Sequence, residues 1–308
     1  MKVIKHLMRF LLVAVLSAIY ACNEPEPIRV LIVSGQNNHN WKVSHRAIKQ
    51  ILDNSGMFIS DVVLTPPAGG DMSRFNPNFD DYDVVVLDYN GDRWGEKVDE
   101  AFLKYVQKGG GIIVYHAADN AFAGWDEFNK IIALGGWEGR DEKSGPYCYI
   151  KDGKMVLDSS PGRGGSHGRQ REYPMHCRNA EHPITKDLPD NWLHAQDEMY
   201  DFMRGPANIK DLLYSGKSDA ATGGSGREEP LVFTVDYGKA RIFHIMLGHC
   251  GASLENNPAM QCAGFQTLLL RGAEWAAIGK VTQPVPNDFP TNAAVSLRKD
   301  YGREISSK

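Results

Sequence analysis

The stretch YDVVVLDYNGDRWGEKVDEAFLKYVQKGGGIIVY, residues 82–115, decides the fold. It opens with an apolar run at 82–88 and closes with another at 112–115, each of the length of a buried strand. Between the two runs an apolar face recurs at helical spacing, and glycines at 109–111 end the helix. The face consists of Val98, Phe102, Tyr105 and Val106. A strand, a helix and a strand in this order indicate a parallel sheet covered by helices.

The same pattern lies upstream. Apolar runs at 29–34 and 58–64 predict two more strands, and apolar residues at helical spacing over 43–52 predict a helix between them. The segment 65–81 is rich in Pro, Gly and Asp, which is typical of a loop. The strands are apolar almost without interruption, so both faces of the sheet are expected to be covered.

Downstream the pattern is interrupted and then returns. The region from about 120 to 225 is polar and Gly-rich, and it predicts an irregular insertion of loops and short elements, with a strand near 172–177. Strands at 231–235 and 240–247 flank a tight turn and predict a hairpin. A helix at 258–278 closes a single domain over 29–280. The tail at 281–308 contains three prolines, and the pattern leaves open whether it packs on the domain.

The N-terminus resembles a lipoprotein signal. Three basic residues precede an apolar run at 10–21 that is too short to span a membrane, which predicts a signal peptide over 1–21. Ile19-Tyr20-Ala21-Cys22 resembles a lipobox, so lipidation of Cys22 and a tether over 22–28 are expected, with cleavage that leaves Cys22 unmodified as the alternative. The chain would then be an exported lipoprotein, periplasmic or attached to the outer membrane through its lipid, with exposure at the cell surface left open.

Composition excludes several classes. Removal of the signal takes the formal charge from −4 to −7, and there is no basic run of the kind that nucleic-acid binding needs. The four remaining cysteines form no CxxC pair, which argues against a zinc ribbon or a thioredoxin-like site. Disulfides are permitted in an exported protein, but spacing does not fix their pairing.

Candidate site residues follow the strands, because ligands of open α/β sheets bind at the carboxyl ends of the strands. Asn37 and His39 follow the first strand, Asn90 follows the third, and His116 with Asp119 follows the fourth. His249 follows the last strand, whereas His244 lies inside that strand and is interpreted as a core residue. Three imidazoles at one edge of a sheet favour a general acid–base site or a metal site. Hydrogen bonding within its own loop remains the alternative for His39.

Two further polar segments lie in the insertion. The loop at 162–169 could bind an anion through its backbone, with Arg163 and Arg169 nearby, or it could be a plain surface loop. His194, Asp197 and Glu198 form a polar cluster in which His194 and Glu198 share a face if the stretch is helical. The HExxH zinc motif is absent from the sequence, so a metalloprotease is not supported.

Several long segments resemble the ThuA-like (trehalose utilisation) family. They include LIVSGQNNHNWK (31–42), GGGIIVYHAADNAFAGW (109–125), SPGRGGSHGRQREY (160–173), HAQDEMYDFMRGP (194–206) and DYGKARIFHIMLGH (236–249). The resemblance implies a flavodoxin-like, doubly wound, mostly parallel sheet similar to that of class I glutamine amidotransferases. Those enzymes carry a nucleophilic cysteine after a central strand, where this sequence has Tyr115-His116-Ala117, so a cysteine amidotransferase is not expected. Cys250 is the only thiol at a predicted strand end.

The family is associated with disaccharide catabolism, often beside oxidoreductases that make 3-keto sugars. The resemblance therefore implies a sugar-catabolic enzyme acting on (3-keto) glycosides or disaccharides by elimination, hydrolysis or isomerisation, with a sugar oxidoreductase as functional partner. The alternative is a carbohydrate-binding lipoprotein without catalysis. As an enzyme, we expect His116 to act as base with Asp119 orienting it, and His249 or His39 to donate a proton. A divalent metal bound by His39, His116 and His249 is left open. Residues expected to bind substrate are Asn37, His39, Asn90, His167, Arg169 and Glu198.

Overall fold

A computed structural model describes residues 26–251, 253 and 256–298. The predicted signal peptide and the lipidation site Cys22 lie outside the described residues. Within the described part of the chain, no helix is both long enough and apolar enough to cross a membrane.

Five parallel strands form one end of the sheet, with β2 at its edge. Their order is β2-β1-β3-β4-β13, the flavodoxin-like order of a doubly wound sheet. Their bounds are β1 Ile28–Ser34, β2 Phe58–Leu64, β3 Val84–Leu87, β4 Gly111–Tyr115 and β13 Arg241–Ile245. The α/β fold expected from the alternation of strands and helices is therefore confirmed.

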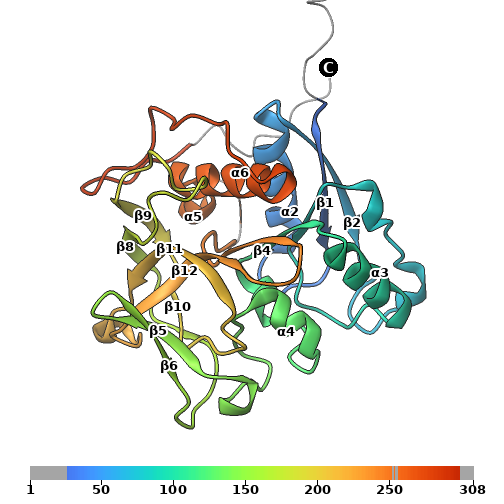
Figure 1. Ribbon diagram of the computed structural model, residues 1–308, viewed down its shortest axis with the longest axis horizontal. Helices are drawn as coiled ribbons and strands as arrows, with labels where there is room; N and C mark the ends of the chain where they lie inside the picture. Colours follow the sequence, from blue (N-terminus) through green and yellow to red (C-terminus); the bar gives the residue numbers. More distant parts are fainter. Residues whose placement is uncertain (1–25, 252, 254–255, 299–308) are drawn as a thin grey trace, which may run out of the picture.

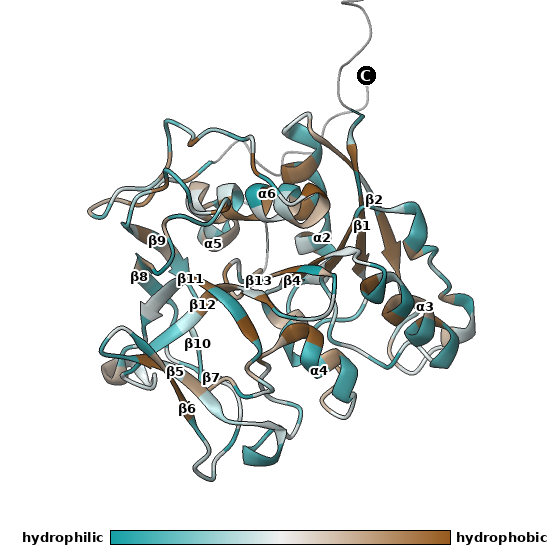
Figure 2. Cartoon of the chain, in the orientation of Figure 1, coloured by the Kyte–Doolittle hydropathy of each residue, from teal (hydrophilic) through white to brown (hydrophobic). Residues whose placement is uncertain are grey.

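Helices cover both faces of this parallel part. Figure 1 shows α2 (Trp41–Asn54) and α6 (Ala263–Ile278) on one side and α3 (Glu96–Gln107) and α4 (Asp126–Ile132) on the other. The central strands are fully buried; for example, Val30, Val85 and Ile113 expose none of their surface. Figure 2 shows hydrophobic colour along β1 and β2 and both colours on α3, as expected for a helix with one face on the core. The predicted helix at 258–278 is divided at Cys262 into α5 (Pro258–Gln261) and α6.

The insertion is more regular than the sequence indicates. It contributes seven strands: β5 Tyr147–Lys151, β6 Lys154–Asp158, β7 Ser166–His167, β8 Arg171–Cys177, β9 Asn191–Asp197, β10 Tyr200–Asp201 and β11 Ile209–Lys217. With β12 (Glu228–Val235), β11, β8 and β9 extend the sheet in antiparallel fashion beyond β13. The strand predicted near 172–177 is β8, and the other short strands were not recognised because half-exposed antiparallel strands carry polar residues on one face, so that their sequence resembles a loop. The predicted hairpin is confirmed as β12–β13.

The C-terminal tail packs on the domain through its described part. Leu193 N–H donates to Thr291 O at 2.8 Å, and the ring of Phe289 lies 5.4 Å from that of Trp192.

Short 3₁₀ helices fill several connections, namely η1 Met72–Arg74, η2 Phe79–Asp81, η3 His116–Asn120, η4 Glu142–Ser144 and η5 Ala220–Thr222. The helix η3 follows β4 directly and carries His116 at its first position.

Candidate functional site

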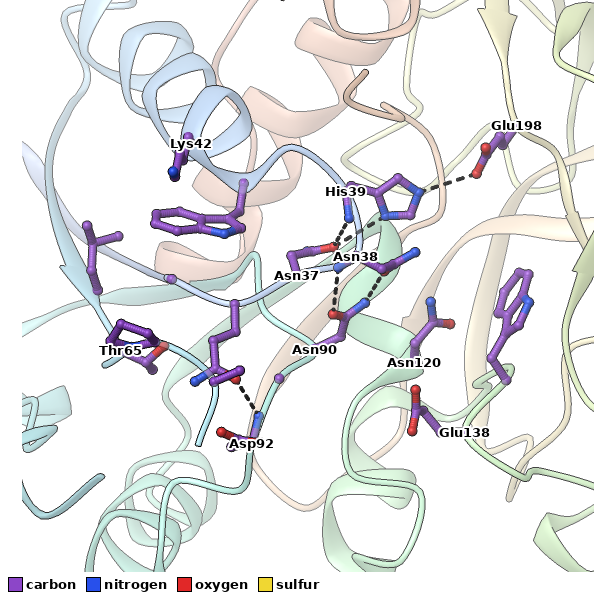
Figure 3. A pocket seen from close by; sticks show the side chains of 18 of the residues that line it. Asn37, Asn38, His39, Lys42, Thr65, Asn90, Asp92, Asn120, Glu138 and Glu198 are labelled. Atoms are coloured by element: carbon purple, nitrogen blue, oxygen red, sulfur yellow. Dashed lines mark hydrogen bonds and ion pairs between the residues drawn. The ribbon is translucent and has the colours of Figure 1, made fainter. Parts of the chain in front are cut away.

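The carboxyl ends of the parallel strands open into a polar cavity of about 1050 Å³. Five of the predicted site residues line it, drawn from both the parallel core and the insertion: Asn37, His39, Asn90, His167 and Glu198. Figure 3 shows His39 between Asn37 and Glu198. Four predicted residues are not among those that line the cavity: His116 and His249 lie beside Glu198, Arg169 is exposed, and Asp119 is fully buried.

Four imidazoles surround the carboxylate of Glu198. Nε2 of His39 and Nε2 of His116 lie 3.4 and 3.8 Å from Glu198 Oε2. Nε2 of His249 and Nε2 of His167 lie 3.4 and 3.8 Å from Glu198 Oε1. We call these five residues the histidine–glutamate cluster. The sequence places three of the histidines at one sheet edge, and the structure adds His167 and Glu198 from the insertion.

His116 is the innermost imidazole of the cluster, with a side chain that is 2% exposed. Its Nδ1 lies 2.8 Å from Met246 O, a hydrogen bond that places the proton on Nδ1 and makes Nε2, which faces the cluster, an acceptor. Burial, and after it the neighbouring His39, lowers the pKa of His116 to about 3, so this imidazole is neutral at physiological pH. The backbone of His116 has φ +42°, a strained conformation of the kind that concentrates at functional sites.

Glu198 is positioned by its neighbour Asp197, the last residue of β9. The buried carboxylate of Asp197 accepts the backbone N–H groups of Glu198 (2.8 Å), Gly248 (2.7 Å) and His249 (3.0 Å), and Nε2 of His194 at 2.7 Å. Burial opposes the ionised form of Asp197, but these hydrogen bonds and the charge of His194 outweigh it and lower the pKa. The stretch is a strand, so the helical interpretation of His194 and Glu198 is wrong.

The expected pairing of Asp119 with His116 is also wrong. Asp119 Oδ2 lies 3.3 Å from Nε2 of His244, whose Nδ1 lies 2.8 Å from Ile132 O. Both side chains are fully buried beneath the cavity, which confirms His244 as a core residue. The carbonyl of Met246, which follows β13, takes the orienting role assigned to Asp119.

Sequence reasoning missed Gln170 and Tyr200. Gln170 Nε2 donates to Glu198 Oε1 at 3.2 Å and lies 3.4 Å from His249 Nδ1. Tyr200 stacks on His116 with ring centroids 4.5 Å apart, and its hydroxyl lies 3.1 Å from His116 Nε2. Trp137 and Tyr200 line the cavity. Gln170 and Tyr200 follow no strand of the parallel core, so their sequence positions carry no signal of a site.

A nucleophilic role for Cys250, the thiol at the predicted strand end, is not supported. Cys148, Cys177, Cys250 and Cys262 are all free. Cys250 is buried, and burial, followed by the negative charge of Asp88, raises the pKa of its thiol to about 12. A reactive cysteine needs the opposite shift, because the thiolate is the nucleophile.

Ionised Glu198 and neutral His116 together give the cluster acid–base or ligand chemistry. Burial opposes ionisation of Glu198, but the hydrogen bond from His39 and the other imidazoles outweigh it and hold the pKa of Glu198 well below its usual range. Burial lowers the pKa of His249 as well. A carboxylate among imidazoles beside a cavity can move protons or hold a cation.

Comparison with known proteins identifies the family. A crystal structure of a ThuA-like protein from Parabacteroides merdae is 65% identical, with a match that covers 90% of this chain and 99% of that one and a TM-score of 0.89. A ThuA-like protein from Bacteroides uniformis is 19% identical over 85% of this chain and 96% of that one, with a TM-score of 0.50, which shows the fold alone. No curated protein matches the chain. The family model described as trehalose utilisation matches residues 29–276, and the chain therefore belongs to the ThuA family.

Proposed function

We propose that this chain is a carbohydrate-active enzyme that acts on glycosides or disaccharides oxidised at C3, with the histidine–glutamate cluster as its reaction centre. The observation that carries the proposal is the convergence of four imidazoles on Glu198 at the edge of an open polar cavity. Membership of a family described as trehalose utilisation supports a sugar substrate. The cavity, at about 1050 Å³, is large enough for a disaccharide.

The chemistry follows from the ketone. A C3 carbonyl acidifies the hydrogen on C2, so a base can remove that proton and leave an enolate on the C3 oxygen. The electron pair of the enolate then forms a C1–C2 double bond as the bond from C1 to the glycosidic oxygen breaks. A general acid gives the departing oxygen its proton. The products are an unsaturated keto sugar and the free alcohol. Addition of water across the C1–C2 double bond of the unsaturated sugar then completes a net hydrolysis.

The exposure of the imidazoles divides these tasks. The side chain of His167 is 37% exposed and that of His249 is 17% exposed, whereas His116 is 2% exposed. We therefore assign proton transfer with the sugar to His167, the most exposed of these imidazoles and one that lines the cavity, and not to His116, the base expected from the sequence. Asn37 and Asn90 line the cavity, where their amides can bind hydroxyl groups.

The test is turnover of 4-nitrophenyl 3-keto-glucoside and of 3-keto-trehalose, each beside its unoxidised parent. We expect release of nitrophenol and of glucose from the keto substrates alone, with slower turnover when deuterium replaces the C2 hydrogen. His167→Ala should lower kcat roughly 100-fold or more, the usual contribution of one general acid or base. His176→Gln is the matched control, because His176 pairs with Glu228 on the antiparallel part of the sheet and should retain turnover.

Two results would reject the proposal. Sugars that bind and are recovered unchanged would support the non-catalytic binding protein instead. Equal turnover of keto and parent sugars, without an isotope effect at C2, would remove the elimination chemistry.

We also propose that the chain is exported and anchored through lipid on Cys22, and that a sugar oxidoreductase supplies its substrate by oxidising C3. The basic start, the short apolar run and the lipobox-like sequence before Cys22 support the anchor. Metabolic labelling with palmitate should mark the wild-type chain but not Cys22→Ser. Labelling that persists in Cys22→Ser would reject the anchor.

A further inference from the structure

We infer that His39, His116 and Glu198 form a binding site for one divalent transition-metal ion, and that His249 orients the carboxylate without being a ligand. The inference stands on the geometry of these side chains and does not depend on which sugar, if any, enters the cavity.

The three ligand atoms are spaced as a metal requires. One ring nitrogen of His39, one ring nitrogen of His116 and a carboxylate oxygen of Glu198 all lie within 4.8 Å of one another. The Nε2 atoms of the two rings face the same oxygen, Oε2, at 3.4 and 3.8 Å. Zinc-type ions bind nitrogen and oxygen at about 2.0–2.2 Å, so neighbouring ligands around one ion lie roughly 3.0–3.6 Å apart. Shifts of up to about 1 Å would bring all three atoms onto one ion.

The hydrogen bonds on the far side of each ring fix which nitrogen is free. Nδ1 of His116 faces Met246 O at 2.8 Å, and Nδ1 of His39 faces Asn37 Oδ1 at 3.3 Å. With Nδ1 as the donor in each ring, Nε2 is the nitrogen left to bind an ion. Nε2 of His39 faces Glu198 Oε2 at 3.4 Å, and Nε2 of His116 has the Tyr200 hydroxyl at 3.1 Å, a neighbour that an ion would displace. Metal-binding histidines characteristically donate their other N–H to a carbonyl or carboxylate in this way. A single proton can bridge only one of these pairs, whereas a metal ion serves all three atoms at once.

The other carboxylate oxygen of Glu198, Oε1, has different hydrogen-bond partners. Oε1 of Glu198 lies 3.2 Å from Gln170 Nε2 and 3.4 Å from His249 Nε2. The amide of Gln170 also faces His249 Nδ1 at 3.4 Å, and because an amide N–H donates, Nδ1 is the acceptor and Nε2 carries the proton. His249 thus donates to Oε1 and holds the carboxylate so that Oε2 points at the two other histidines. The ligand set of His39, His116 and Glu198 therefore replaces the set of His39, His116 and His249 that the sequence left open.

The site has the donor set and openness of a functional metal centre. Its ligands are two imidazole nitrogens and one carboxylate oxygen, a set that suits Zn²⁺, Fe²⁺, Co²⁺ or Mn²⁺ better than Ca²⁺ or Mg²⁺. Three protein ligands leave positions for water or substrate, as in catalytic sites. The cavity lies beside them, because His39 and Glu198 both line it. An ion held there would supply Lewis-acid stabilisation of an enolate oxygen.

Metal binding is measured directly, without substrate. The chain is purified without a metal-affinity tag, treated with EDTA and dialysed, and then titrated with Zn²⁺, Co²⁺ and Mn²⁺ by calorimetry, with elemental analysis of the gel-filtered product. We expect one ion per chain, and a visible Co²⁺ spectrum typical of nitrogen and oxygen ligands. His39→Ala and Glu198→Gln should each weaken the Kd more than about 100-fold, and His249→Gln only about 10-fold, the range for a residue that orients a ligand.

His176→Gln is the control that should bind as the wild type does. His39 is the variant least at risk of misfolding, because its side chain reaches the cavity, and far-ultraviolet circular dichroism checks each variant. No stoichiometric binding of any of the three ions would overturn the inference. So would wild-type affinity in His39→Ala and Glu198→Gln. If His249→Gln lost as much affinity for the metal ion as His39→Ala does, the proposed ligand set would be overturned.

Discussion

Asp197→Asn is the substitution that tests most directly how the site is held in place. The carboxylate is fully buried and accepts four hydrogen bonds, two on each oxygen. Oδ2 accepts from His194 and Gly248, and Oδ1 accepts from Glu198 and His249. Whichever way the amide of asparagine turns, its NH₂ group faces two donors. The variant therefore loses two hydrogen bonds, faces N–H against N–H, and leaves the buried His194 without its counter-charge.

The structure sets the size of the effect. A hydrogen bond to a charged group contributes about 1.5–3 kcal/mol, and removal of one partner of a buried ion pair costs about 3–5 kcal/mol. We expect the free energy of unfolding to fall by about 3–5 kcal/mol. For a domain of this size, the midpoint of thermal unfolding should fall by about 6–15 °C. The affinity for Zn²⁺ should fall about 10–100-fold, because Asp197 fixes the backbone that carries Glu198 and His249.

The measurement is urea and thermal unfolding followed by circular dichroism, with Zn²⁺ titration of the same preparations. Asp80→Asn is the matched control: Asp80 pairs with Lys108 at 2.6 Å, but both side chains are about half exposed, so the change should be within about 1 kcal/mol. A loss below about 1 kcal/mol in Asp197→Asn would refute the reasoning, since it would mean that the four donors find other partners at little cost.

Three further predictions concern other parts of the fold. Burial, partly offset by two serine hydroxyls, raises the pKa of Asp88 to about 7. The carboxyl group of Asp88 therefore loses its proton at a lower pH in the unfolded chain than in the folded one. Between about pH 4 and pH 7 the free energy of unfolding should therefore decrease as pH rises, by up to about 1.4 kcal/mol per unit from this group, and Asp88→Asn should remove that slope in urea titrations. Gly248→Ala should lower the free energy of unfolding by about 2–5 kcal/mol, because φ is +98° and the new Cβ would lie 2.6 Å from Phe265. The control Gly153→Ala, with φ +74° and open space around the new Cβ, should lower it by about 1 kcal/mol. Equal losses of unfolding free energy in the two variants would contradict the steric argument. Cys250 should resist iodoacetamide at pH 7.5 in the folded protein, and rapid modification seen by mass spectrometry would show that the thiol is accessible and ionised.

The sequence by itself determined the parallel core and one edge of the site. Continuous apolar runs such as 84–87 and 112–114 fold as buried strands in almost any context, because burial on both faces leaves no place for polar residues. The carboxyl ends of parallel strands then meet at one edge, which brings His39, His116 and His249 together without knowledge of the loops. The family assignment rested on long motifs and was confirmed.

Only the tertiary structure decided how the site is completed. Glu198 and His167 reach the cluster from an insertion whose strands pair with partners far along the chain, and half-exposed strands give no clear pattern in sequence. The partners of His116 and Asp119 were equally hidden, since both residues lie in the same short segment after β4 yet bond to different strands and loops. Periodicity reports which face of an element is buried, but a hydrogen bond depends on ångström distances between atoms of distant segments. Those distances are set by the packing of the whole domain.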